Sequence, residues 1–267
     1  MREPIDVDCD RFAWRECGAG ELVVLLHGLG GSRISWEPQL AELGRSRRLA
    51  AWDLPGYGAA APLPDHPLTF RALADAAAAF IRALGAQRAH VVGISMGGMI
   101  AQYLAAWHPQ HVRSLTLLSS SPAFGLDGTD PDAWRAARLA PLDHGLEPIA
   151  FADRVLGAIS GPHTEPAAMA GQRAAMARIT GAALRRSIDC LVTHDSRALL
   201  PGIQAATLVM VGELDDETPV SYSRSLVDQL PNARLQVIPG AGHLLNVEAP
   251  ELVNQHIERH LAAVEAA

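Results

Sequence analysis

Cysteine is scarce in this 267-residue chain, and positive charge is not concentrated in any one segment. The three cysteines, Cys9, Cys17 and Cys190, form no CxxC pair, and so sparse a set supplies neither a disulfide framework nor a thiolate metal site. Lys and Arg together number 22 against 29 Asp and Glu, which gives a net charge of −7. Because phosphate contacts need clustered cations, we do not expect nucleic acid as a partner.

Long apolar runs are also lacking. The longest, such as Leu22–Leu26, fall far short of the roughly 20 residues that cross a bilayer. The segment Met1–Asp6 is acidic and lacks the apolar centre of a signal peptide. Hydrophobic residues make up 49% and charged residues 19%, a balance that excludes a largely disordered chain. We therefore expect a folded cytoplasmic protein without a membrane span, a monomer or homodimer with a small-molecule substrate.

Short apolar runs alternate with helical patterns over most of the chain. Helices are predicted over Thr69 to Leu84, with Thr69 as the N-cap and Gly85 after the end, and over about 97–107 and 250–264. A strand–helix–strand alternation predicts an α/β protein with a mostly parallel, doubly wound sheet. The predicted strands are 22–26, 49–52, 89–94, 114–118, 207–211 and 235–238.

The alternation stops between residues 123 and 200. This segment contains five prolines and Ala-rich helical pieces, and it holds no convincing strand. We therefore predict an α/β core formed by residues 1–122 and 201–267, with residues 123–200 inserted as a helical cap.

The strongest chemical signal is the sequence Gly93-Ile94-Ser95-Met96-Gly97, which fits G-x-S-x-G. It follows a predicted strand and leads into a predicted helix, and this is the context in which the motif forms a sharp turn that exposes its serine. The helix N-terminus behind the turn offers free N–H groups to a developing oxyanion. Ser95 is therefore the candidate nucleophile.

A serine nucleophile needs a base, and the base needs an acid to orient it. His243 follows Gly240-Ala241-Gly242 at the predicted carboxyl edge of the sheet, where Ser95 also lies, so it is the candidate base. The acid should follow the strand at 207–211, where Asp215 and Asp216 stand together. We favour Asp215 because it lies in the middle of the turn, with Asp216 as the second choice.

The residues after these aspartates are expected to begin a helix. Thr218 is the expected N-cap and Pro219 the first helical residue, while Glu217 is expected to interact with the helix dipole. The chain order of the three candidates, serine, aspartate and histidine, is that of the α/β-hydrolase arrangement.

An oxyanion hole is expected from two backbone amides. The glycine-rich turn His27–Gly31 follows the first strong strand and can present the N–H of Leu29, and the N–H of Met96 follows the nucleophile. His27 is interpreted as a hydrogen-bonding scaffold residue, because His243 is better placed to act as the base.

Over nearly its full length the chain resembles the α/β-hydrolase superfamily, of the capped carboxylesterase and lactonase type. The resemblance implies Ser95 as nucleophile, Asp215 as acid, His243 as base, the Leu29 and Met96 amides as oxyanion donors, and a lid inserted after the sixth strand. It rests on five motifs: His27–Gly30, Asp53–Gly58, Gly93–Gly98, Gly212 with Asp215 and Thr218-Pro219, and Gly242-His243 followed by Glu248 and Pro250.

Differences in sequence from related groups narrow the range of reactions that we expect. Relatives that dehalogenate or open epoxides carry aspartate where this chain has Ser95. C–C hydrolases usually have other residues at the positions of Ile94 and Leu244. Segments 95–104 and 243–248 are similar to 3-oxoadipate enol-lactonases. The resulting prediction is a serine esterase or lactonase. The alternatives are a C–C bond hydrolase, a perhydrolase, and a ligand receptor with little turnover.

Four residues are predicted to contact the substrate, which we expect to be small and largely apolar: Trp134, Met169, Met176 and Leu244. Asp53 is expected to anchor the turn at 54–58. The arginines at 173, 178, 185 and 186 are expected in solvent, although one pointing inward would favour a carboxylate-bearing substrate. The histidines at 108, 111, 256 and 260 are expected on the surface. The histidines show no regular ligand spacing, so we predict no metal, and we expect no cofactor.

Overall fold

The structure is a computed structural model that describes residues 3–64 and 67–267. It contains an eight-stranded sheet with the order β1-β2-β4-β3-β5-β6-β7-β8. Strand β2 runs antiparallel to β1 and β4, and the other neighbours are parallel. The strands are β1 (Ile5–Asp8), β2 (Ala13–Gly18), β3 (Leu22–Leu26), β4 (Arg48–Trp52), β5 (Ala89–Ile94), β6 (Val112–Leu118), β7 (Thr207–Gly212) and β8 (Ala233–Ile238).

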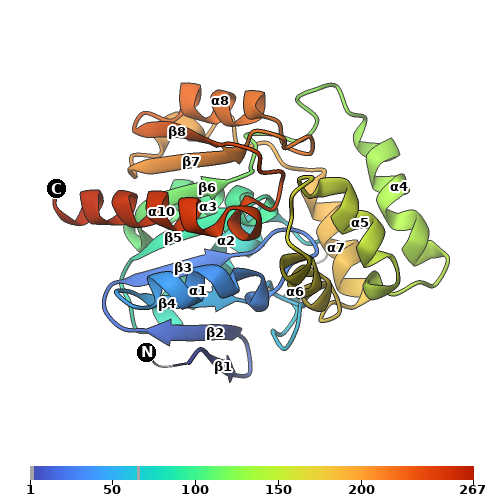
Figure 1. Cartoon of the computed structure of the whole chain (residues 1–267), viewed down its shortest axis with the longest axis horizontal. Helices are drawn as coiled ribbons and strands as arrows, with labels where there is room; N and C mark the ends of the chain where they lie inside the picture. Colours follow the sequence, from blue (N-terminus) through green and yellow to red (C-terminus); the bar gives the residue numbers. More distant parts are fainter. Residues whose placement is uncertain (1–2, 65–66) are drawn as a thin grey trace.

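Helices cover both faces of the sheet (Figure 1). Two separate apolar cores result, one that includes Phe80 and Ile100, and another that includes Leu40 and Ile257. Burial on both faces explains why the central strands are continuous apolar runs. The helices of this layer are α1 (Glu37–Leu43), α2 (Phe70–Ala83), α3 (Met96–Trp107), α8 (Val220–Gln229), α9 (Leu245–Glu248) and α10 (Pro250–Glu265), with short 3₁₀ turns η1 (Arg33–Trp36), η2 (Pro109–His111) and η4 (Leu200–Gly202).

Local sequence signals set the bounds of α2. The Thr69 hydroxyl accepts a hydrogen bond from the Ala72 N–H (3.1 Å), which satisfies one of the free amides of the first turn. Gly85 follows the helix with φ +78°, a conformation that costs little without a Cβ. Both features match the prediction.

Helices α4 to α7 lie between β6 and β7 and gather at one end of the sheet, to the right in Figure 1. They are α4 (Pro131–Asp143), α5 (Ala152–Ile159), α6 (Pro166–Met176) and α7 (Gly181–Leu191), with the 3₁₀ turn η3 (Pro148–Phe151). We call them the cap. The chain enters and leaves it at one place, because the Phe124 N–H donates to His194 O (2.8 Å) and the Ser196 N–H donates to Pro122 O (2.8 Å).

The cap is fastened to the core by Arg178, which follows α6. Its guanidinium lies 3.3 Å from the Asp53 carboxylate, whose side chain is fully buried, and its carbonyl accepts from the Gly58 N–H (3.0 Å). Asp53 also pairs with the buried Arg33 at 2.9 Å and accepts from the Ala59 N–H (3.4 Å). Asp53 therefore holds its own turn, as predicted, and the cap as well. The expectation that Arg178 is solvated was wrong.

The two N-terminal strands β1 and β2 were not predicted. Two further expectations were wrong. Helix α8 begins at Val220 with Pro219 as its N-cap, because Thr218 directs its hydroxyl to Asp215 instead. His260 is buried, and its Nε2 bonds to the carbonyl of Leu115 (3.0 Å).

No helix within the described residues is long and apolar enough to cross a membrane.

Candidate active site

Ser95 occupies a strained turn between β5 and α3. Its φ of 53° and ψ of −122° are unusual for a residue with a Cβ. The turn fits because neighbouring positions lack side chains: a Cβ on Gly28 would lie 3.0 Å from the Ser95 Cβ, and one on Gly97 would lie 2.0 Å from the Leu26 carbonyl oxygen. The Ser95 hydroxyl makes no hydrogen bond with another described residue, and Ser95 lines a cavity beneath the cap.

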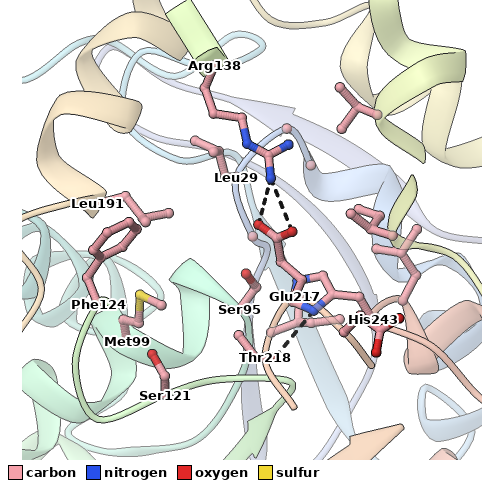
Figure 2. A pocket seen from close by; sticks show the side chains of 18 of the residues that line it. Leu29, Ser95, Met99, Ser121, Phe124, Arg138, Leu191, Glu217, Thr218 and His243 are labelled. Carbon is pink, nitrogen blue, oxygen red and sulfur yellow. Dashed lines mark hydrogen bonds and ion pairs between the residues drawn. The ribbon is translucent and has the colours of Figure 1, made fainter. Parts of the chain in front are cut away.

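His243 lines the same cavity (Figure 2). Its Nδ1 lies 3.1 Å from both carboxylate oxygens of Asp215, and its ring is almost completely buried. Burial lowers the pKa of His243, but the Asp215 carboxylate and the hydrogen bond to it raise the pKa more, so the net shift is upward. Such a pair fixes the tautomer in which Nδ1 carries the proton and leaves Nε2 free to accept one.

Asp215 is fixed by four donors. Its carboxylate accepts the N–H groups of Glu217 (3.1 Å) and Thr218 (2.8 Å), the Thr218 hydroxyl (2.8 Å), and the His243 ring N–H. Burial raises the pKa of Asp215, but the neighbouring His243 and these hydrogen bonds leave it below its usual value. Asp216 also lines the cavity but makes no bond to His243. The structure thus brings Asp215, and not Asp216, to the histidine.

Glu248 holds the loop that carries His243. Its carboxylate accepts the N–H groups of Gly242 (2.6 Å), Leu244 (2.9 Å) and, from the cap, Gly161 (3.0 Å). The His243 N–H in turn donates to the cap carbonyl of Ile159 (3.0 Å). The two residues that flank the histidine and the end of α5 are therefore joined through one carboxylate. Sequence analysis included Glu248 in a motif but assigned it no role.

Two backbone amides near Ser95 have no hydrogen-bond partner among the described residues and are the candidates for the oxyanion hole. The Met96 N–H is the first of α3, and the first amides of a helix have no carbonyl partner within it. The Leu29 N–H donates to no other described residue, and Leu29 lines the cavity with Ser95. The geometry is compatible with the predicted oxyanion hole.

His27 serves the scaffold. It is 1% exposed, its Nε2 accepts from the Leu54 N–H (2.9 Å), and its Nδ1 lies 2.9 Å from the Gly28 carbonyl oxygen. Burial lowers the pKa of His27, which keeps the ring neutral at pH 7. With both ring nitrogens engaged in the backbone, His27 has no free atom to act as a base.

The cavity has a volume of about 310 Å³. Of the predicted substrate contacts, Trp134, Met176 and Leu244 line it, but Met169 does not, and the Met169 sulfur instead accepts the Ser160 hydroxyl (3.2 Å). Twelve of the lining side chains are apolar, and thirteen are polar or charged. The apolar ones are Leu29, Ile94, Met99, Ala123, Phe124, Trp134, Val155, Leu156, Ile159, Met176, Leu191 and Leu244.

Sequence reasoning missed several polar groups of the cavity. Arg138 on α4 donates two hydrogen bonds to the Glu217 carboxylate, at 2.9 and 3.1 Å, so Glu217 is not a helix-dipole residue as predicted. Gln172 on α6 is 6% exposed and lines the cavity, and its amide makes no hydrogen bond with another described residue. Only helix periodicity could have placed Gln172, one turn before Met176.

The other residues singled out from the sequence lie outside the cavity. Arg173 and Arg185 pair with Asp153 (3.1 Å) and Asp143 (2.6 Å) on the cap, and Arg186 donates to the Leu63 carbonyl (2.9 Å). Within the described ranges, no group of three or more His, Cys, Asp or Glu side chains could hold a metal ion.

Comparisons with known proteins agree with this architecture. The chain is 35% identical to a pimeloyl-[acyl-carrier protein] methyl ester esterase from Chromobacterium violaceum, over 85% of this chain and 88% of the relative. It is 32% identical to a putative carbamate hydrolase, RutD, from Caulobacter sp., over 91% of each chain. A hydrolase structure from Pseudomonas aeruginosa superposes with a TM-score of 0.85 at 28% identity, covering 97% of this chain and 98% of that one.

The model of the alpha/beta hydrolase family matches residues 23–256. This match confirms the predicted fold class, with a mostly parallel sheet and a helical segment inserted after the sixth strand. It also confirms the resemblance from which a hydrolase was expected. The chain belongs to the alpha/beta hydrolase family.

Proposed function

We propose that the protein is a serine hydrolase that cleaves a carboxylic ester or lactone through an acyl-enzyme intermediate. The observation that carries the proposal is the buried His243–Asp215 pair, with 3.1 Å between the ring Nδ1 and the carboxylate, at the wall of the cavity that Ser95 also lines. The named activity of the Chromobacterium violaceum relative, an ester hydrolysis, supports the same reaction type.

The proposed mechanism assigns one task to each group. His243 Nε2 takes the Ser95 proton while Ser95 Oγ attacks the substrate carbonyl, and Asp215 stabilises the imidazolium that forms. The Leu29 and Met96 amides donate to the oxyanion. His243 then protonates the leaving alkoxide. In the second half, the same imidazole activates a water that releases the acyl group from Ser95. No hydrogen bond joins Ser95 to His243 in the free protein, as is common before substrate binds.

The substrate proposed is small and mainly apolar. A cavity of about 310 Å³ lies at the lower end of the usual size for small-molecule sites. Twelve aliphatic and aromatic side chains line it, and among them Trp134 and Phe124 are in edge-to-face contact at a centroid distance of 5.2 Å. A short acyl chain fits this space better than a long one.

The test is the Ser95→Ala variant. We expect it to fold normally and to lose hydrolysis of p-nitrophenyl butyrate by about 10³-fold or more. It should also lose labelling by a fluorophosphonate probe, which needs an activated serine. Ser121→Ala is the matched control, because Ser121 lies in the same cavity on a different strand end and should keep its labelling. Full labelling of Ser95→Ala would refute the assignment of the nucleophile.

One substrate screen can identify which type of bond the protein cleaves. A panel of short esters, five- and six-membered lactones, a ring-fission diketone, and acetate with hydrogen peroxide distinguishes esterase, lactonase, C–C hydrolase and perhydrolase activity. Fast turnover of esters or lactones supports the proposal. Tight binding with only a few turnovers per hour across the panel would instead identify a ligand receptor.

A further inference from the structure

The ionisable groups that face the cavity are unevenly balanced. Apart from His243, the charged side chains of the described residues that line it are Asp127, Arg138, Asp216 and Glu217, three carboxylates and one guanidinium. None of the four arginines singled out from the sequence is among them. The charge that a substrate meets therefore depends on what Arg138 is already bound to.

Arg138 is already paired through one of its nitrogens. One terminal nitrogen donates to both carboxylate oxygens of Glu217, at 2.9 and 3.1 Å, as the dashed lines in Figure 2 show. The guanidinium carbon also lies 4.9 Å from the centre of the Trp134 ring, which is a cation–π distance. The backbone N–H of Glu217 donates to Asp215, so the side chain that neutralises Arg138 projects from the loop that holds the candidate acid.

The remaining carboxylates have no cationic partner among the described residues. Asp127 accepts a hydrogen bond from the Thr129 N–H (2.9 Å), and hydrogen bonds from Thr129 lower the pKa of Asp127. Asp216 is exposed and makes no ion pair with another described residue. With Arg138 and Glu217 cancelling, Asp127 and Asp216 leave the cavity wall with two uncompensated negative charges.

We propose that the Arg138–Glu217 pair makes the site select against anionic substrates, so that its substrates are uncharged or amine-bearing esters. This inference rests on the proposed function and specifies its substrate class. A substrate carboxylate would compete with Glu217 for the charge of Arg138, and it would meet Asp127 and Asp216 as it did so. If the substrate carboxylate pairs with Arg138, Glu217 loses its partner, and if Glu217 keeps Arg138, the substrate carboxylate has none. An uncharged substrate leaves the pair intact.

The test uses three methyl esters with the same six-carbon acyl chain: methyl hexanoate, monomethyl adipate and methyl 6-aminohexanoate. They differ only in the group at the far end, which is uncharged, negative or positive at pH 7. We expect kcat/KM for monomethyl adipate to be at least about tenfold below the value for methyl hexanoate, and the aminohexanoate to be no worse than the hexanoate. Raising the ionic strength should shrink these differences, because the charges are partly exposed.

Glu217→Gln tests the pair itself. The substitution keeps the backbone bond to Asp215 but releases Arg138, so the adipate-to-hexanoate ratio of kcat/KM should rise by about tenfold. Asp132→Asn is the matched control, because it removes a carboxylate from the first turn of the same helix as Arg138 but outside the cavity wall, and it should leave the ratio unchanged.

Failure of the inference and failure of the proposed function give different results. If methyl hexanoate is cleaved by the native protein and not by Ser95→Ala, the function stands, and equal rates for the anionic ester would overturn the charge selection. If Ser95→Ala is as active as the native protein, the function fails. The ratios of kcat/KM among the three esters then still decide the charge preference, since they do not depend on which residue is the nucleophile.

Discussion

Replacement of Asp215 by asparagine tests the centre of the proposed mechanism. The Asp215 carboxylate accepts from the Thr218 N–H at 2.8 Å and from the His243 ring N–H at 3.1 Å. An amide has only one acceptor oxygen, so its NH₂ must face one of these donors. If it faces His243, the favoured tautomer reverses and Nε2 carries the proton. We expect kcat to fall by about 10³- to 10⁴-fold, which corresponds to about 4–5.5 kcal/mol of activation free energy.

The same variant should change the pH profile. In the native protein the Asp215 carboxylate raises the pKa of His243 against the opposing effect of burial, so activity should fall on the acid side as the imidazole becomes protonated. Without the carboxylate, burial dominates and the acid limb of kcat/KM should move to lower pH. The assay is p-nitrophenyl butyrate hydrolysis from pH 5 to 9.

Asp216→Asn is the control for Asp215→Asn. Asp216 is exposed and makes no bond to His243, so this variant should keep kcat within about twofold. The reasoning is refuted if Asp215→Asn keeps native kcat with an unmoved acid limb, or if Asp216→Asn causes the larger loss.

Three other outcomes are expected. Glu248→Gln should lower kcat by about tenfold with little change in KM, because an amide keeps only one of the two oxygens that accept the N–H groups beside His243. The control is Glu251→Gln, exposed at the start of α10, which should have no effect in the same assay. His194 and His260 are buried, and burial lowers the pKa of each to about 4. Below about pH 6.5 the unfolded chain therefore binds protons at these two histidines that the folded chain does not bind. Urea titrations should show that the free energy of unfolding falls by about 2 kcal/mol for each pH unit by which the pH is lowered near pH 5. A slope near zero would contradict this. Gln172→Leu should change the free energy of unfolding by less than about 1 kcal/mol, because the amide borders the cavity and makes no hydrogen bond with another described residue; a loss of several kcal/mol would mean that the amide holds the cap in place.

The sequence predicts best where burial is strong and local. The strand Leu22–Leu26 is fully buried on both faces, so its apolar run identifies it without tertiary information. Strand β1 is the opposite case, because three of its four residues are exposed at the sheet edge and its alternation Ile-Asp-Val-Asp is only four residues long. Strand β2 is only partly buried and mixes polar with apolar residues, so it forms no continuous apolar run.

The candidate site divides in the same way. Ser95 and His243 lie in short motifs whose backbone geometry is local, so the sequence identifies them. The roles of Glu217 and Thr218 depend on residues distant in the sequence: Glu217 bonds a cap helix 79 residues earlier in the chain, and the Thr218 hydroxyl lies 3.3 Å from the His243 Nδ1. Local helix-capping rules assigned both to α8, because those rules see only the nearest residues.

The crossing of the chain between core and cap has a consequence for how substrate range could change. Pro122 and Ser196 are joined by a backbone hydrogen bond of 2.8 Å, and Ala123 bridges Asp195, so the inserted segment starts and finishes at a single antiparallel contact. A segment with adjoining ends can be exchanged for another of different length without stretching the sheet. Transplanting a cap from a relative at these two positions would alter the walls that hold the acyl and alcohol groups while Ser95 and its turn are inherited unchanged.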